Sequence, residues 1–149
     1  MNLLQRAAAA LTLCGAAGVS TPAQAERLLF DDLGGRPGLV ALMDEFMVRL
    51  LADPRMAPHF RPANQTRVKE QLVEQVCELS GGPCTYRGAD MKTAHENLLI
   101  TRADFLALVE VLQDAMSARQ VPFAVQNRLL ARLAPMSRDV VTPHAERQP

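Results

Sequence analysis

The stretch MKTAHENLLITRADF, residues 91–105, places His95 among small and apolar residues just ahead of a helix-start pattern. Only His59 and His144 accompany this histidine in the chain. A lone histidine among apolar neighbours is more often a packed side chain than a metal ligand. Local composition therefore leaves the role of His95 open, and its meaning depends on the segments that flank it.

The segments after His95 have the pattern of two helices. Thr101 followed by Asp104 resembles a capping box, which predicts a helix over RADFLALVEVLQDAMSA, residues 102–118. A last helix is expected over PFAVQNRLLARLAPMSRDVV, residues 122–141, and Pro135 should kink or divide it. The expected apolar faces are Phe105, Leu108, Val109 and Leu112 on the first helix, and Val125, Leu129, Leu130, Leu133 and Met136 on the second.

Two further helices are predicted ahead of His95. One follows Pro37, and Gly34-Gly35 ends a short helical piece before it. Its apolar face is Leu39, Leu42, Met43, Phe46, Met47 and Leu50. Asn64 is a candidate N-cap for the next helix, residues 65–80. Its expected apolar face is Val68, Leu72, Val76 and Leu79, with Arg67, Gln71 and Gln75 along one edge. No convincing alternating run occurs, so the predicted fold class is all-α.

The composition of the 149-residue chain agrees with one helical domain. Hydrophobic residues make up 48%, charged residues 21%, and the formal net charge is zero. That balance does not suggest a nucleic-acid-binding surface. Aromatic residues are scarce at 4% and tryptophan is absent, so Leu, Val, Ala and Met must build most of the core.

The first 25 residues have the layout of a secretory signal peptide. Arg6 precedes a thirteen-residue apolar run, and Ala23 and Ala25 occupy the positions of an A-x-A cleavage site. Cleavage after Ala25 would give an exported protein, periplasmic in a bacterium, with no stable membrane anchor. The alternative is an N-terminal anchor that stays attached.

Two cysteines remain after such cleavage, because Cys14 leaves with the signal peptide. Cys77 and Cys84 are seven positions apart, and the intervening ELSGGP lets the chain turn back. In an oxidising compartment they could form a disulfide. The alternative is two half-buried thiols.

Several motifs now line up in one order along the chain. Gly34-Gly35 comes first, then Pro-His-Phe ending at Phe60, then Gly-Gly-Pro and Thr-Tyr-Arg-Gly within residues 81–88. The Met-Lys-x-x-His segment containing His95 and then Phe105 follow. This order and spacing resemble the group I truncated haemoglobins, short globins with a two-over-two helical sandwich around haem. The resemblance covers roughly residues 28–142, which predicts a globin domain over 26–142 and a C-terminal tail over 143–149.

The resemblance implies a non-covalently bound haem b, with His95 as the axial ligand of the iron. Imidazole binds iron through one ring nitrogen, and a carbonyl can orient the other. If residues 91–95 are helical, the Met91 carbonyl is a candidate for that role. Phe60 matches the phenylalanine that packs on the porphyrin. Other matching wall positions are Phe46, Phe105, Leu108 and Leu133. Lys92 and Tyr86 are candidates for contacting the haem propionates, although each could equally be an ordinary solvated side chain.

The ligand side departs from the family pattern. Members usually have Phe-Tyr on the second helix, where this chain has Phe46-Met47. Members often have a glutamine facing the bound ligand, and ungapped alignment puts Leu72 there with Gln71 one residue away. The expected pocket is therefore Met47, Val68, Leu72 and Val76. Gln71 should point off the pocket, unless a one-residue error or a helix rotation brings it in. Met47 is a less favoured candidate for a sixth iron ligand than an open position.

Three functions compete at this stage. The leading hypothesis is reversible binding of a diatomic gas, namely oxygen, nitric oxide or carbon monoxide. The alternative is an enzyme of the nitric oxide dioxygenase type, which would need an external electron donor because the chain has no flavin or nicotinamide module. A third reading is a helical bundle without haem that serves protein contacts.

Overall fold

The computed structural model describes residues 28–143, and within that range every regular element is helical. The prediction of an all-α fold is therefore confirmed. The elements in chain order are α1 (Leu29–Asp32), α2 (Gly35–Ala52), α3 (Ala57–Phe60), α4 (Gln65–Leu79), α5 (Met91–His95), α6 (Arg102–Ala118), α7 (Phe123–Leu133), the 3-10 turn η1 (Ala134–Met136) and α8 (Ser137–Val140). The predicted signal peptide and the tail beyond residue 143 lie outside the described residues.

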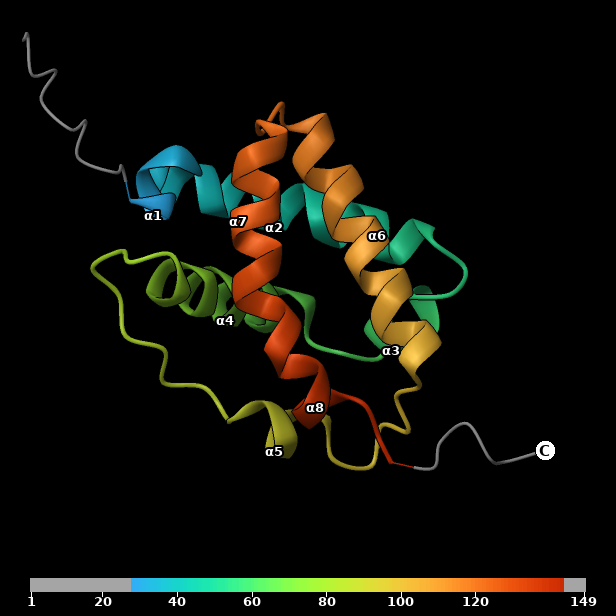
Figure 1. Cartoon of the computed structure of the whole chain (residues 1–149). Helices are drawn as coiled ribbons and strands as arrows, with labels where there is room; N and C mark the ends of the chain where they lie inside the picture. Colours follow the sequence, from blue (N-terminus) through green and yellow to red (C-terminus); the bar gives the residue numbers. More distant parts are fainter. Residues whose placement is uncertain (1–27, 144–149) are drawn as a thin grey trace, which may run out of the picture.

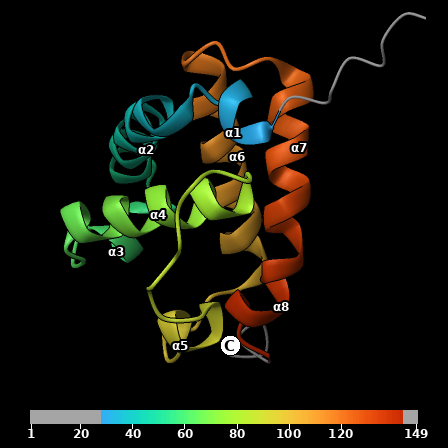
Figure 2. The same ribbon diagram turned by 90° about the vertical axis from the view of Figure 1, so that its left-hand side faces the viewer.

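The four long helices form two crossed layers. Helices α2 and α4 pack together as one layer, and α6 and α7 form the other (Figure 1). The view turned by 90° again separates the α2–α4 pair from the α6–α7 pair (Figure 2). Within residues 28–143 no helix combines the length and apolarity that crossing a membrane requires.

Helix α2 forms where its apolar residues recur at helical spacing. All six predicted core residues of this helix are buried, as expected from their positions on one face. The helix begins at Gly35, two residues earlier than predicted, because proline is tolerated in a first turn and Pro37 lies there. Gly34 precedes the helix with φ of 85°, a left-handed conformation that glycine adopts without penalty.

Helix α4 buries a different face from the predicted one. The Asn64 N-cap is confirmed, since its side chain accepts a hydrogen bond from the Arg67 backbone N–H. The buried residues of the helix are Val73, Gln75, Val76 and Cys77, whereas Val68, Leu72 and Leu79 are half-buried. The predicted apolar face is thus fully buried only at Val76, and Gln75, which was expected at its edge, belongs to the interior. Contacts on two sides, to α2 and, through Gln75, to Met91 of α5 and Met136 of η1, widen the buried surface.

Helices α6 and α7 follow the predicted boundaries closely. The capping box is present, with Thr101 and Asp104 each accepting a hydrogen bond from the backbone of the other. Pro135 divides the last helix as expected, because α7 ends at Leu133 and a 3-10 turn precedes α8. The predicted α6 face is only partly right. Leu112 is buried, but Phe105, Leu108 and Val109 are half-buried, and the interior takes Ala107, Val111, Ala115 and Met116 instead.

Helix α5 is short and has no buried residue. The Asp90 side chain caps it by accepting a hydrogen bond from the Thr93 N–H. It lies beside α8 and apart from the α2–α4 layer (Figures 1 and 2). A helix of this length is not stable by itself in water, so its neighbours must hold it in place.

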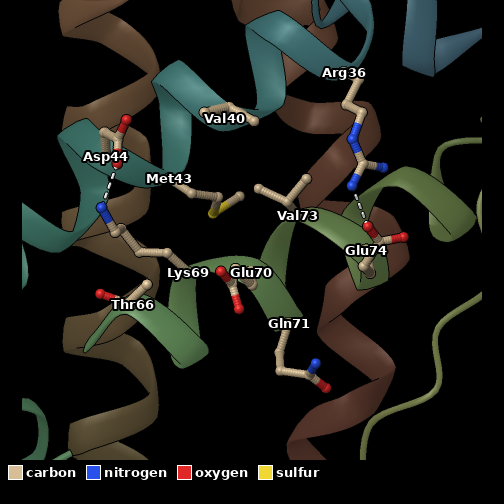
Figure 3. A pocket seen from close by; sticks show the side chains of 10 residues that line it. All are labelled: Arg36, Val40, Met43, Asp44, Thr66, Lys69, Glu70, Gln71, Val73 and Glu74. Atoms are coloured by element: carbon tan, nitrogen blue, oxygen red, sulfur yellow. Dashed lines mark hydrogen bonds and ion pairs between the residues drawn. The ribbon is translucent and has the colours of Figure 1, made fainter. Parts of the chain in front are cut away.

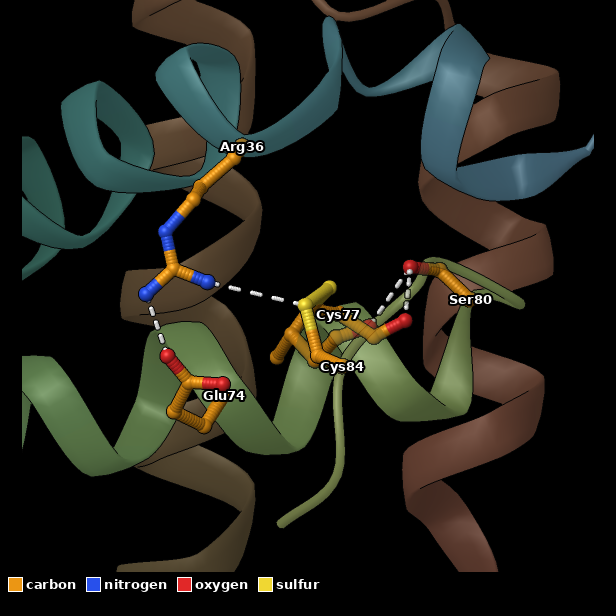
Figure 4. The surroundings of a disulfide bond; sticks show 6 residues. Arg36, Glu74, Cys77, Ser80 and Cys84 are labelled. Carbon is orange, nitrogen blue, oxygen red and sulfur yellow. Dashed lines mark hydrogen bonds and ion pairs between the residues drawn. A yellow bond between two sulfur atoms is a disulfide. The ribbon is translucent and has the colours of Figure 1, made fainter.

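A disulfide closes the start of the segment that joins α4 to α5. Cys77 and Cys84 are bonded, with their Cα atoms 5.8 Å apart, so the disulfide interpretation holds and the two-thiol alternative does not. The Arg36 guanidinium lies beside this bond, donating from Nη1 to Cys84 Sγ at 3.6 Å and from Nη2 to Glu74 (Figure 4). The bond therefore attaches the chain ahead of α5 to the end of α4.

Candidate metal and cofactor site

His95 is the last residue of α5, and its imidazole is held by its own helix. Its Nδ1 atom lies 2.8 Å from the Met91 carbonyl oxygen, one helical turn earlier. When Nδ1 carries the proton and donates to that carbonyl, Nε2 presents a lone pair. The Met91 contact that the sequence predicts is thus present. The side chain of His95 is half-buried.

Apolar side chains at the edge of the core are left incompletely covered. Phe60, Leu72, Leu108 and Leu133 are partly buried and pack against the core from four different helices. Phe105 and Val68, also candidates from the sequence, are half-buried as well. Such partial burial leaves apolar area that a flat apolar group could cover. These residues and a half-buried imidazole with one available nitrogen fit a metalloporphyrin.

Three other predicted site residues lie inside the core. Phe46, Met47 and Val76 are exposed by 3%, 4% and 2% of their surfaces. Phe46 and Val76 belong to the main core cluster. Their side chains can form the inner wall of a site, and the buried Met47 thioether shows the packing role that methionine commonly has.

Tyr86 and Lys92, the two candidates for a propionate, differ in their surroundings. The Tyr86 hydroxyl donates to the Ala89 carbonyl at 2.8 Å. Burial raises the pKa of Tyr86, and the nearby Asp90 carboxylate raises it further, so the phenol stays protonated at neutral pH. Lys92 is exposed on α5, three residues before His95. The exposed ammonium is the better placed of the two to meet an anionic group.

Gln71 lies against the loop that joins α4 to α5. A Cβ atom at Gly88 would meet both Gln71 Oε1 and the Tyr86 hydroxyl, so the three residues are close neighbours. In Figure 3 the Gln71 side chain extends from α4 on the side away from α2. Adjacent residues differ by about 100° around a helix, so Gln71 and Leu72 point in different directions, as expected.

Gln75 is the residue that the sequence interpretation misplaced. It is exposed by only 8%, and its Nε2 atom lies 3.2 Å from Met91 Sδ and 3.9 Å from Met136 Sδ. A signal for its burial existed, because a residue three positions after Leu72 lies only about 60° from it around a helix. Gln75 therefore places a buried amide between α4 and the helix that contains His95.

A surface groove of about 540 Å³ lies elsewhere, between α2 and α4. Two ion pairs cross it, Arg36 with Glu74 and Lys69 with Asp44 (Figure 3). His95 does not line this groove, and neither does any of the apolar candidates described above. The groove is therefore distinct from the site around His95.

Comparisons with known proteins agree with this geometry. Residues 28–142 match the family described as Bacterial-like globin. A group 1 truncated haemoglobin of Mycolicibacterium paratuberculosis is 33% identical over 117 residues, which is 78% of this chain and 86% of that protein. A group 1 truncated haemoglobin of Chlamydomonas moewusii is 34% identical over 121 residues, covering 76% of this chain and 69% of that protein.

Solved structures show the same arrangement of helices. The truncated haemoglobin of Tetrahymena pyriformis in its Fe(III) form superposes with a TM-score of 0.75 at 25% identity, over 78% of this chain and all of the other. The 2/2 haemoglobin of Synechococcus sp. PCC 7002, whose haem is covalently attached, gives 0.73 at 21% identity over 77% and 98% of the two chains. This chain belongs to the group 1 truncated haemoglobins, and the two crossed helix layers are the two-over-two globin sandwich.

Proposed function

We propose that this chain is a haem protein that reversibly binds a diatomic gas at an iron ligated by His95. The observation that supports the proposal most directly is the 2.8 Å contact between His95 Nδ1 and the Met91 carbonyl. It orients the imidazole with Nε2 available and makes that nitrogen a better donor to a metal. The family implies haem, and the half-buried apolar side chains at the edge of the core fit it.

Each residue has a defined role in this proposal. His95 supplies the axial nitrogen. Phe60, Leu72, Leu108, Leu133 and Phe105 cover the apolar faces of the ring, and Lys92 meets a propionate. Bound haem supplies an iron with one position open to a gas molecule. The chain lacks a Cys-x-x-Cys-His motif, which supports a non-covalent haem b. Extraction with acidified ketone checks this, because a covalently attached haem stays with the protein.

The ligand side of the proposed site lacks a strong hydrogen-bond donor. Met47, Val68, Leu72 and Val76 are its expected wall, and none has a polar side chain beyond the Met47 thioether. Oxygen bound to iron carries partial negative charge and gains from a donor, whereas carbon monoxide and nitric oxide gain less. A missing hydrogen bond costs about 1–1.5 kcal/mol, roughly a tenfold change in affinity. We therefore propose fast oxygen release and a preference shifted towards the other two gases.

Visible absorption spectra of the purified protein test the haem proposal. The ferric, ferrous and carbon monoxide forms report haem content and the type of axial ligand together. We expect a Soret band in the wild-type protein and loss of the histidine-ligated signature in His95→Ala. His59→Ala is the matched control, because His59 is an exposed histidine on α3 and should leave the spectrum unchanged. Absence of haem uptake by the wild-type chain would refute the proposal.

A turnover assay separates gas binding from the enzymatic alternative. The protein is mixed with nitric oxide and oxygen in the presence of a chemical reductant, and nitrate is measured. Each nitrate formed leaves the haem ferric, so any globin turns over here only as fast as the added reductant restores ferrous haem, and equimolar myoglobin sets that basal rate. Nitrate formation well above the myoglobin rate would instead assign the chain as a nitric oxide dioxygenase.

We also propose that the chain is exported. The Cys77–Cys84 disulfide supports this proposal, because disulfides persist in oxidising compartments and are uncommon in the cytosol. The N-terminal layout of a signal peptide supports it independently. The binding reaction would then take place outside the cytoplasm.

A further inference from the structure

We infer that Gln75 is a positioning residue for the axial imidazole, acting through the side chain of Met91. The inference rests on the proposed function, since it concerns how His95 is held for binding iron. Gln75 is on α4, whereas Met91 and His95 are the first and last residues of α5. The Gln75 amide thus connects the two helices on either side of the proposed site.

The amide of Gln75 is buried and has weak partners. Its Nε2 donates to Met91 Sδ at 3.2 Å, with Met136 Sδ farther away at 3.9 Å. Thioether sulfur is a weak acceptor, and leaving a buried amide poorly paired is unfavourable. The Met91 contact offsets part of that cost, so displacing Met91 from this place is unfavourable.

Helix α5 depends on such contacts for its position. It has five residues, none of them buried, and it packs mainly beside α8. Met91 lies one turn, about 6 Å along the helix axis, from His95. The same residue offers its side chain to Gln75 and its carbonyl to His95 Nδ1. Fixing Met91 therefore fixes the imidazole.

Gln71 provides a matched control within the same helix. It is also a glutamine, one helical turn earlier, but it lies beside Gly88 and Tyr86 in the loop. Replacing Gln71 also removes a side-chain amide from α4, but it leaves the contact between Gln75 and Met91 in place. Gln71 is half-buried and Gln75 is buried, so general packing alone would lower stability more at Gln75, and the comparison rests on the iron–histidine band described below.

The test compares Gln75→Leu, Met91→Leu, the double variant and Gln71→Leu as haem-loaded proteins. Two readouts are used: the iron–histidine stretching band of the ferrous protein by resonance Raman, and the rate of haem transfer to excess apomyoglobin. We expect Gln75→Leu and Met91→Leu to shift or broaden the band and to speed haem loss about tenfold. The band shift and haem-loss rate of the double variant should be no larger than those of either single variant, because both substitutions remove the same contact.

Gln71→Leu and Met136→Leu should leave the band in place. An unchanged band and haem-loss rate in Gln75→Leu, or effects of Gln75→Leu and Met91→Leu that simply add, would overturn the inference. If Gln75→Leu does not fold, Gln75→Met replaces it, because a flexible apolar side chain of similar length can fill the same space.

Failure of this inference is distinguishable from failure of the proposed function. A wild-type protein that takes up no haem, or that keeps its axial signature in His95→Ala, refutes the function. A wild-type protein with a histidine-ligated haem and an unaffected Gln75→Leu variant refutes the inference alone. Hydrogen exchange of residues 91–95 in the apoprotein adds a readout without haem, and we expect faster exchange in Gln75→Leu than in Gln71→Leu.

Discussion

Gln71 and Gln75 are the same residue type one helical turn apart, yet packing gives them different surroundings. Gln71 meets the loop after α4, whereas Gln75 is buried against the Met91 and Met136 sulfur atoms. His95 differs from them, because the Met91 carbonyl that orients its imidazole lies one turn earlier in the same helix. The two glutamines acquire their surroundings from the segments across from them.

Replacing Leu72 tests the apolar ligand side at a single residue. Leu72→Gln would place an amide donor on α4 beside the proposed iron. Oxygen bound there should be retained longer, with dissociation slowed about tenfold by one added hydrogen bond. Stopped-flow measurement of oxygen dissociation checks this prediction. Leu79→Gln, near the far end of the same helix, serves as the control. Slow release from the wild-type protein with no response to Leu72→Gln would contradict it.

Asp104 makes stability depend on pH. Burial raises the pKa of this carboxyl, but hydrogen bonds from the Thr101 side chain and backbone, together with His59, outweigh burial and hold the pKa below its usual range. A lowered pKa in the folded state stabilises the protein above the unfolded value of about 3.9. That stability is lost as pH falls through the folded pKa, because protonation then favours the unfolded chain.

The corresponding measurement is urea unfolding of wild-type protein and Asp104→Asn at pH 7.5 and pH 3. We expect the wild-type advantage at pH 7.5, about 0.5 kcal/mol for a carboxylate at a helix N-terminus, to shrink at pH 3. His59 Nε2 lies 3.8 Å from Asp104 Oδ1 and belongs to the same cluster. An advantage that grows on acidification would reverse the assigned sign.

Short elements in this chain depend on specific restraints, and α5 is the clearest case. It follows a long loop, has no buried residue and lies beside α8. The disulfide shortens the free part of that loop by joining Cys84 to α4. Two restraints therefore act on the helix that contains His95: the disulfide in the loop ahead of it, and the contacts that α5 makes with its neighbours.

Removing the disulfide should lower the free energy of unfolding. The bonded cysteines are separated by seven positions, and closing a loop of this length stabilises the folded state by about 2.5 kcal/mol in the chain-entropy description. Cys77→Ala/Cys84→Ala should lose about that amount in urea unfolding. Adding a dithiol reductant should destabilise only the wild-type protein, which makes the double variant its own control. Equal stability with and without reductant would show that the bond is absent or without effect.

The junction of α1 and α2 requires glycine at position 38. A Cβ atom there would lie 2.1 Å from the Leu33 carbonyl oxygen, which is backbone and cannot move aside alone. Alanine usually stabilises a helix relative to glycine, but here the clash should reverse the sign. We expect Gly38→Ala to lower stability by about 1–3 kcal/mol, measured by urea unfolding. A raised unfolding midpoint would mean that α1 packs less closely on α2.

At the scale of the whole molecule, α5 lies outside the two crossed helix layers, beside α8. The long helices α2, α4, α6 and α7 bury most of the core, and the half-buried apolar residues lie at its edge. A bound haem would complete the burial that the chain alone does not achieve. The globin domain and the proposed export signal are separate parts of the sequence.

Processing of the N-terminus tests export of the whole chain. Expressed in a bacterium with its own N-terminus, the protein should be recovered from the periplasmic fraction beginning at Glu26. Intact-mass measurement checks the cleavage position. A variant in which Ala23 and Ala25 are replaced by leucine should accumulate uncleaved, because the cleavage site requires small residues. Wild-type protein that keeps residues 1–25 and stays with membranes would support the anchor alternative.

Local signals accounted for much of this fold. Helical spacing predicted α2 with all six of its buried residues, and Asn64, Thr101 with Asp104, and Pro135 marked boundaries that the structure confirms. These features act over one or two turns, so the sequence alone determined them. Resemblance to a family added the two-over-two arrangement, which helical spacing by itself does not specify.

Packing between elements decided the rest. Three features depend on how α4 lies against α2, α5 and η1: its buried face, the interior position of Gln75 and the joining of Cys77 to Cys84. A stripe of apolar residues predicts one contact face. Because α4 is covered on two sides, residues outside that stripe, such as Val73 and Gln75, are buried as well. Whether a segment forms a helix is decided locally, because helical hydrogen bonds join residues four positions apart. The contact that orients His95 is local as well, whereas the place of α5 beside α8 belongs to the tertiary structure, because residues distant in sequence provide it.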